Sequence, residues 1–121
     1  MRILTAFMFV CLASAPALAQ SYPVSGRWGV GSGGGDGPID CSNKRVIEFN
    51  GSQRSDSNGS VPGYRIKSIT ANGQGEWRIV DQFTTGQIRN GTIGYTLRRG
   101  NANHLELDMQ RGGSLKLQRC K

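Results

Sequence analysis

Few residues of this chain have the type and spacing that catalysis requires. His104 is the only histidine, and no serine or cysteine beside it is arranged as a nucleophile for it to activate. Asp36 and Asp40 could act as paired acids or calcium ligands, although aspartates in a glycine-rich segment are also typical of turns. Asp56-Ser57-Asn58-Gly59 begins like a calcium-binding loop but lacks its spacing and its closing glutamate. We therefore expect no enzymatic activity, no metal site and no cofactor.

Two cysteines remain for chemistry in the mature chain, because Cys11 lies inside an apolar N-terminal segment that we expect to be cleaved. Cys41 and Cys120 would close a loop of about 80 residues, which chain entropy predicts to stabilise the fold by roughly 4 kcal/mol. A redox or metal pair is the alternative, but two distant cysteines with one histidine make a poor metal set. We expect a structural Cys41–Cys120 disulfide, within one chain or between two.

The N-terminal segment has the composition of a secretion signal. Residues 1–19 begin with Arg2 as the charged start, continue as an apolar run and end on the small-residue motif Ala17-Leu18-Ala19, which is typical of a signal peptide rather than a membrane span. No later segment contains the roughly 20 apolar residues that a transmembrane helix needs. The signal resembles a bacterial one, so we expect a periplasmic or secreted product in which residues 20–121 form a single domain.

The mature chain is basic. Without Arg2 it carries 14 lysines and arginines against 8 acidic residues, a net charge of +6. Such a surface attracts lipid headgroups, lipopolysaccharide, acidic glycans, nucleic acid or an acidic protein alike, because long-range attraction depends on sign and not on chemistry. No basic run exceeds two consecutive residues, so solubility alone explains the charge equally well.

Three basic residues could form an anion-binding patch. Arg65 and Lys67 share one face of a predicted strand, and Arg78 lies on the same face of its predicted hairpin partner. Elsewhere, Glu106 and Asp108 would lie between Arg98 and Lys116 and neutralise them across the sheet. The aromatic residues of the hairpin lie on its other face, so they do not interleave with the three cations as stacking platforms for nucleic acid do. Nucleic acid is therefore only a third expectation for the partner.

The elements that must position these residues are strands. From Val24 onward apolar and polar residues alternate, interrupted by glycine, asparagine and serine. Strands are expected at about Val24–Val30, Lys44–Asn50, Tyr64–Thr70, Trp77–Val80, Gly86–Arg99, His104–Met109 and Leu115–Leu117. Gly31 to Pro38 and Gly51 to Ser60 are expected to be loops. Seven or eight such strands predict an all-β, up-and-down antiparallel barrel, with a β-sandwich as the alternative.

One motif at the start of the first strand resembles a family signature. Gly26-Arg27-Trp28 resembles the glycine-any-tryptophan signature of lipocalins and the wider calycin group, which are small meander barrels. In those barrels an arginine near the end of the chain packs across that tryptophan. The resemblance therefore implies a contact of Arg119, which is in phase with Leu117, with Trp28 at the barrel base, worth about 0.5 to 2 kcal/mol.

The chain is shorter than a typical lipocalin and lacks the helix that follows the last strand in that family. Bacterial metalloprotease inhibitors with lipocalin-like barrels are nearer in size and compartment. Their inhibitory N-terminal segment corresponds in position to Gln20–Pro23.

Two modes of binding follow for an exported, non-enzymatic protein. In the first, the barrel is solid, and its outer surface or N-terminal segment binds an anionic envelope macromolecule or inhibits a protein target such as a protease or lysozyme. In the alternative, a small apolar ligand enters the barrel mouth and contacts Tyr64, Trp77, Ile79 and Tyr95. In so small a barrel, the same four side chains can instead serve to fill the core.

Overall fold

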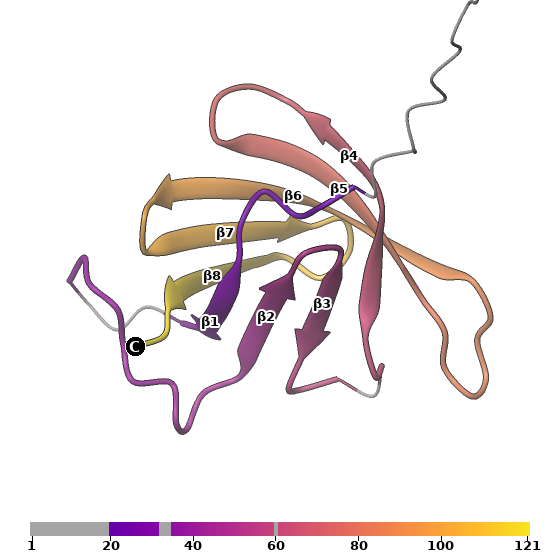
Figure 1. The fold of residues 1–121 in the computed structure, drawn as a ribbon, viewed down its shortest axis with the longest axis horizontal. Coiled ribbons are helices and arrows are strands. Elements are labelled where there is room, and N and C mark those ends of the chain that lie inside the picture. Colours follow the sequence, from indigo (N-terminus) through magenta and orange to yellow (C-terminus); the bar gives the residue numbers. More distant parts are fainter. Residues whose placement is uncertain (1–19, 32–34, 60) are drawn as a thin grey trace, which may run out of the picture.

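The computed structural model describes residues 20–31, 35–59 and 61–121, so the predicted signal, residues 1–19, lies outside the described residues. Eight strands follow one another: β1 (Gly26–Val30), β2 (Val46–Asn50), β3 (Gln53–Asp56), β4 (Tyr64–Ala71), β5 (Glu76–Phe83), β6 (Gly91–Asn101), β7 (His104–Met109) and β8 (Ser114–Arg119). They pair in chain order, and β8 pairs with β1 to close the sheet (Figure 1). The predicted all-β barrel is confirmed, and the sandwich alternative is wrong because β1 and β8 are joined.

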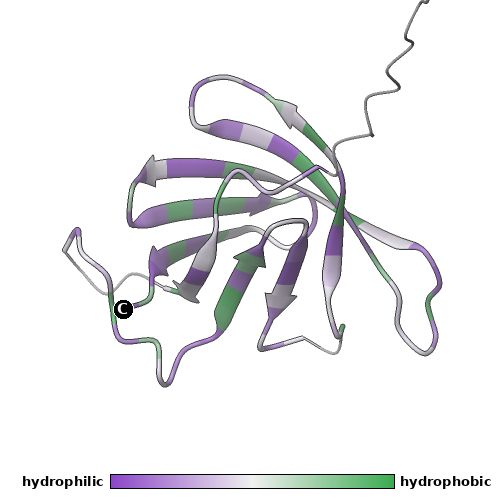
Figure 2. Ribbon diagram, in the orientation of Figure 1, coloured by the Kyte–Doolittle hydropathy of each residue, from purple (hydrophilic) through white to green (hydrophobic). Residues whose placement is uncertain are grey.

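Alternation along the strands places one face of the sheet inside the barrel. In β7, Leu105 and Leu107 are buried, while His104, Glu106 and Asp108 are partly exposed on the other face. Figure 2 shows hydrophobic and hydrophilic residues alternating along the strands. The buried apolar side chains form one core: Tyr22, Val24, Trp28, Ile47, Phe49, Ile66, Ile79, Tyr95, Leu97, Leu105, Leu107 and Leu117. Within the described residues, no helix is long and apolar enough to cross a bilayer.

One strand lies where a loop was predicted. Gly51 to Ser60 was expected to be a connection, but it contains β3, which pairs with β2 and β4; Ser60 itself lies outside the described residues. The sequence of β3 is Gln-Arg-Ser-Asp, and its buried inward residue is Arg54. The prediction was wrong because a strand with a charged residue facing inward shows no apolar alternation.

Several strand boundaries also differ from the predictions. The sixth strand begins at Gly91 rather than Gly86, because Asn90 adopts a positive φ of 56° and turns the chain there. The first strand begins at Gly26 rather than Val24. The hairpin predicted between β4 and β5 and the turn predicted between β7 and β8 are both present, and the β4–β5 hairpin projects from the body of the barrel in Figure 1.

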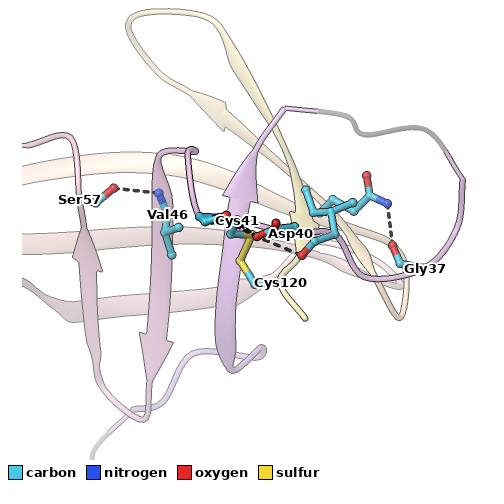
Figure 3. Close-up of a disulfide and its surroundings, with 9 residues drawn as sticks. Gly37, Asp40, Cys41, Val46, Ser57 and Cys120 are labelled. Atoms are coloured by element: carbon cyan, nitrogen blue, oxygen red, sulfur yellow. Dashed lines mark hydrogen bonds between the residues drawn. A yellow bond between two sulfur atoms is a disulfide. The ribbon is translucent and has the colours of Figure 1, made fainter.

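The disulfide fastens the glycine-rich loop to the outside of the barrel. Cys41 and Cys120 are bonded within the chain, as predicted (Figure 3). The loop can approach because Gly29 lies beneath it, where an added Cβ would come 2.8 Å from Sγ of Cys41. The side-chain amide of Gln118 donates to the carbonyl of Gly37 over 2.6 Å. A disulfide is typical of proteins in oxidising compartments.

Candidate functional site

A buried ion pair lies in the interior of the barrel. Nε of Arg54 on β3 donates to Oδ2 of Asp81 on β5 over 2.8 Å, and the two residues are 5% and 0% exposed. The hydroxyls of Tyr95 and Tyr22 donate to Oδ2 and Oδ1 of the same carboxylate, each over 2.8 Å. The guanidinium carbon of Arg54 also lies 3.9 Å from the centroid of the Tyr64 ring. Among the described residues, every buried side-chain nitrogen and oxygen has a hydrogen-bond partner, so the interior polar groups are fully compensated.

Burial of these groups suppresses ionisation of the two tyrosines. Loss of solvation disfavours a phenolate and the charge of Asp81 disfavours it further, so the pKa values of Tyr22 and Tyr95 lie far above the usual value. Burial alone would lower the pKa of Arg54, but the neighbouring Tyr95 and Asp81 more than offset burial, and the pKa is raised. The network thus joins one guanidinium and one carboxylate to two phenols that stay protonated at neutral pH.

The space left inside the barrel is small. One interior cavity has a volume of about 60 Å³. Its lining residues are Arg45, Ile47, Arg54, Asp56, Tyr64, Ile93, Tyr95, Leu107, Met109 and Leu115. Pockets for small-molecule ligands usually measure roughly 300 to 1,000 Å³, whereas a water molecule takes about 30 Å³. The cavity is therefore far smaller than a typical ligand pocket.

The four residues predicted to line a ligand cavity do not converge on one site. Tyr64 and Tyr95 line the small cavity, but Ile79 is fully buried within the core. Trp77 is half-buried and lies opposite Leu97, away from the cavity. Ile79 and Tyr95 belong to the core and Trp77 packs against it, whereas the ring of Tyr64 meets the ring of Phe83 edge-on.

The three residues of the predicted anion-binding patch are all exposed. Arg65, Lys67 and Arg78 lie on the outer side of the β4–β5 hairpin. Arg65 lies opposite Gln82 and Arg78 lies opposite Thr70, with a register shift at Lys67 between them. Gln82 and Arg78 are four residues apart on β5, so Arg65 and Arg78 are separated by about 14 Å along the strands at the usual rise per residue. The cations therefore form a row, which we call the basic row, and not a compact cluster.

No ion pair among the described residues involves the basic row. The nearest acidic side chain on the same face of β5 is Glu76, and it accepts hydrogen bonds from Arg98 and Asn72. The other outward positions of β4, β5 and the paired part of β6 are uncharged: Ser68, Thr70, Val80, Gln82, Thr92, Gly94 and Thr96. On β4, β5 and β6, no carboxylate lies between these cations, so an anion can approach them there without being repelled.

Further round the barrel, the outer face is neutralised. Arg98 lies within 4 Å of three acidic side chains, those of Glu76, Glu106 and Asp108, and Lys116 lies opposite Glu106 in the β7–β8 pair. Glu106 and Asp108 therefore neutralise Arg98 across the sheet as expected. Glu76 completes that group and was not predicted to belong to it.

The base of the barrel carries the contact that the lipocalin resemblance implies. The guanidinium carbon of Arg119 lies 4.3 Å from the centroid of the Trp28 ring, and Nε1 of Trp28 donates to the carbonyl of Ser25 over 3.1 Å. The N-terminal segment lies close by. Residues 20–23 do not project as an inhibitory arm would, because Tyr22 is buried and the carbonyl of Pro23 accepts a hydrogen bond from Arg99.

The remaining candidates for chemistry make local contacts. Nδ1 of His104 lies 2.9 Å from Oδ1 of Asn101. Asp40 accepts hydrogen bonds from the hydroxyl and the backbone of Ser42, and these bonds lower the pKa of its carboxyl group. The described part of the chain contains no group of three histidine, cysteine or acidic side chains that could hold a metal ion.

Sequence reasoning missed the interior network. Asp81 is in phase with Trp77 and Ile79 but lies one residue beyond the predicted strand Trp77–Val80. Extending that strand would have placed an acidic residue on the inner face. Arg54 gave no such signal, because its strand was not predicted. Tyr22 precedes β1, and nothing in its surroundings in the sequence indicates a partner 59 residues away.

Comparison of the chain with protein-family models, with curated proteins and with solved structures finds no match.

Proposed function

We propose that the protein is an exported, non-enzymatic binding protein that acts through its outer surface on an anionic macromolecule of the cell envelope. The observation that carries this proposal is the basic row of Arg65, Lys67 and Arg78, which is exposed and lacks ion pairs with the described residues. Cations spread over about 14 Å suit a partner with several negative groups better than a single small anion.

Export is supported by two independent features. Residues 1–19 have the pattern of a signal peptide, and the chain holds a disulfide, which a periplasmic or extracellular location would preserve.

The Gly26-Arg27-Trp28 motif with Arg119 over the Trp28 ring supports a lipocalin-like, calycin-type barrel.

The geometry disfavours the other binding modes. A carrier of a small apolar ligand needs several hundred cubic ångströms, and the interior offers about 60 Å³. An inhibitor that inserts its N-terminus into a protease needs a free segment, whereas Tyr22 and Val24 are buried at 7% and 5% exposure. The outer surface is therefore the part of the mature barrel best suited to binding a partner.

Neutralising the basic row tests the proposal. The mature protein with Arg65→Gln, Lys67→Gln and Arg78→Gln should bind lipopolysaccharide at least about tenfold more weakly than the wild type at low ionic strength, and with a flatter salt dependence. Binding is measured by titration calorimetry at several salt concentrations. Circular dichroism establishes that both proteins are folded.

A second triple variant separates position from net charge. Lys44, Lys116 and Lys121 are exposed and lie away from the β4–β5 hairpin, so replacing all three by glutamine removes the same charge from another part of the surface. This variant should retain most of the affinity. Equal losses of affinity in the two variants would mean that net charge alone sets the affinity, and would overturn the basic row as the binding site. Absence of wild-type binding to lipopolysaccharide and to anionic lipid vesicles would overturn the anionic envelope partner.

A further inference from the structure

The side chain of Tyr22 occupies the barrel interior as a ligand would. Its hydroxyl donates to Oδ1 of Asp81 over 2.8 Å, and its ring meets the ring of Phe49 edge-on, with centroids 5.1 Å apart. Tyr22 belongs to no strand and is only 7% exposed. It reaches the core from a segment, residues 20–25, that precedes β1. We call this segment the strap.

The interior groups that receive Tyr22 are held in place without it. Oδ2 of Asp81 accepts from Nε of Arg54 and from the hydroxyl of Tyr95, which fixes the carboxylate and leaves Oδ1 to Tyr22. The walls are supplied by Phe49 and the surrounding apolar core. A flat aromatic ring with one hydroxyl donor thus matches the site, and a benzene ring without the hydroxyl would leave Oδ1 unpaired.

Within the described residues, four hydrogen bonds and one buried side chain attach the strap to the barrel, besides the side chain of Tyr22. The carbonyl of Ser25 accepts from Nε1 of Trp28 over 3.1 Å and from Nη1 of Arg119 over 3.4 Å. Val24 lies in the core at 5% exposure. The amide of Tyr22 donates to the carbonyl of Gly51 over 2.9 Å, and Arg99 donates to the carbonyl of Pro23 over 3.1 Å. The strap joins β1 at Gly26, whose φ of +94° is a conformation that favours glycine. Swinging the strap away would break these bonds and leave the eight-strand ladder intact.

We propose that the barrel interior is a binding site for a small phenol, that Tyr22 occupies it as a tethered ligand, and that a free phenol binds when the strap is displaced. The hydroxyl of the phenol would donate to Oδ1 of Asp81, and its ring would pack against Phe49 as the Tyr22 ring does. This site is separate from the basic row, so the two proposals stand or fall independently.

The test uses p-cresol, which is the tyrosine side chain as a free molecule, and the mature chain carrying Tyr22→Ala. The truncated side chain opens a cavity of its own shape, and p-cresol should bind with a dissociation constant of about 1 mM, as its small size implies. Toluene, which has the shape without the hydroxyl, should bind about tenfold more weakly. Affinities come from the ligand-dependent rise of the thermal midpoint and from NMR titration.

The matched control is Tyr22→Phe, which removes the hydroxyl but keeps the ring and so leaves no room for p-cresol. It should show no saturable binding at concentrations that saturate the alanine variant. Should Tyr22→Ala be unfolded alone, p-cresol should restore its native circular dichroism spectrum, because ligand binding stabilises only the folded state. An alanine variant that neither binds p-cresol nor refolds with it would overturn the proposal, and so would equal affinity for toluene.

Displacement of the strap is tested in the unmodified mature protein by hydrogen exchange. A free phenol must compete with the tethered Tyr22 side chain, so the p-cresol concentration is set well above that which saturates the alanine variant. There the amide of Tyr22 should exchange faster, since its bond to Gly51 is lost with the strap. The amides of β5 and β6 should keep their protection. Unchanged exchange at Tyr22 would overturn the proposal that a free phenol replaces the strap.

Discussion

Two arginines of this barrel are paired with acidic side chains on opposite sides of the sheet. Arg54 points inward to Asp81, and the two side chains are 4% and 0% exposed. Arg98 points outward to three acidic residues, and its side chain is 44% exposed. The inner arginine has one carboxylate and two aromatic rings around it, whereas the outer arginine has more carboxylates and water.

The surroundings of an ion pair, and not the number of its partners, set how much stability is lost when the pair is broken. Inside the barrel each charge has lost its water, so removing one partner leaves the other uncompensated. On the surface, water and salt replace a lost partner at little cost. The basic row is a third case, in which cations keep their water and remain available to a partner outside the chain.

The largest effect should come from breaking the inner pair. Asp81→Asn keeps the shape of the side chain but leaves the Arg54 charge buried without a counter-charge, so it should lower the free energy of unfolding by about 3 to 5 kcal/mol. Urea denaturation of the mature protein measures the change. The control is Asp108→Asn, an exposed partner of Arg98, which should change stability far less; similar losses in the two variants would contradict the comparison.

The inner network should also make the fold sensitive to alkali. The pKa values of Tyr22 and Tyr95 are raised above their ordinary value near 10 by burial and by Asp81. The unfolded chain therefore loses these two protons at a lower pH than the native chain does. Their contribution to stability is fully present below about pH 10 and decreases above it, by up to about 1.4 kcal/mol per tyrosine and pH unit.

Denaturation between pH 8 and 11, combined with tyrosinate absorbance, checks this prediction. The native protein should show two fewer tyrosinates than the unfolded chain, and Tyr22→Phe should reduce the alkaline slope because one of the two groups is gone. Complete ionisation of all three tyrosines in the folded protein would contradict it.

A smaller effect should follow from removing one hydroxyl from the network. Tyr22→Phe leaves Oδ1 of Asp81 without its donor, and an unpaired buried acceptor costs about 1 to 3 kcal/mol. The matched control is Tyr64→Phe, since the structure shows no hydrogen bond from the Tyr64 hydroxyl to any described residue. Chemical denaturation of the two variants should differ by more than 1 kcal/mol; equal stabilities would argue against the Tyr22–Asp81 bond.

The same contrast explains how far the sequence could predict the fold. Strands with an apolar inner face are visible in the alternation, and β7 with Leu105 and Leu107 was predicted at its observed bounds, His104–Met109. β3 was missed because its inward residue is Arg54, whose burial depends on Asp81 from a different strand. A pattern within one strand cannot indicate a partner that only the closed barrel brings to it.

The candidate site divides in the same way. Exposure of Arg65, Lys67 and Arg78 follows from strand phase and was predicted, but their separation depends on the β4–β5 register, which alternation does not contain. The filling of the interior by Tyr22 was not predicted, because it depends on a segment outside the strands. Local periodicity thus predicts which side a residue faces, and tertiary contacts decide what it meets there.

The smallest effect should come from breaking the outer group. Arg98→Gln removes the cation that Glu76, Glu106 and Asp108 surround, and exposed pairs of this kind contribute little because water competes for both charges. The thermal midpoint should shift by no more than about 3 °C.

High salt should abolish even this shift, since it screens the wild-type group. The effect of Asp81→Asn should persist in high salt, because the inner pair is shielded from ions by the barrel wall. A salt-sensitive inner pair or a salt-resistant outer group would reverse the assignment of the two regions.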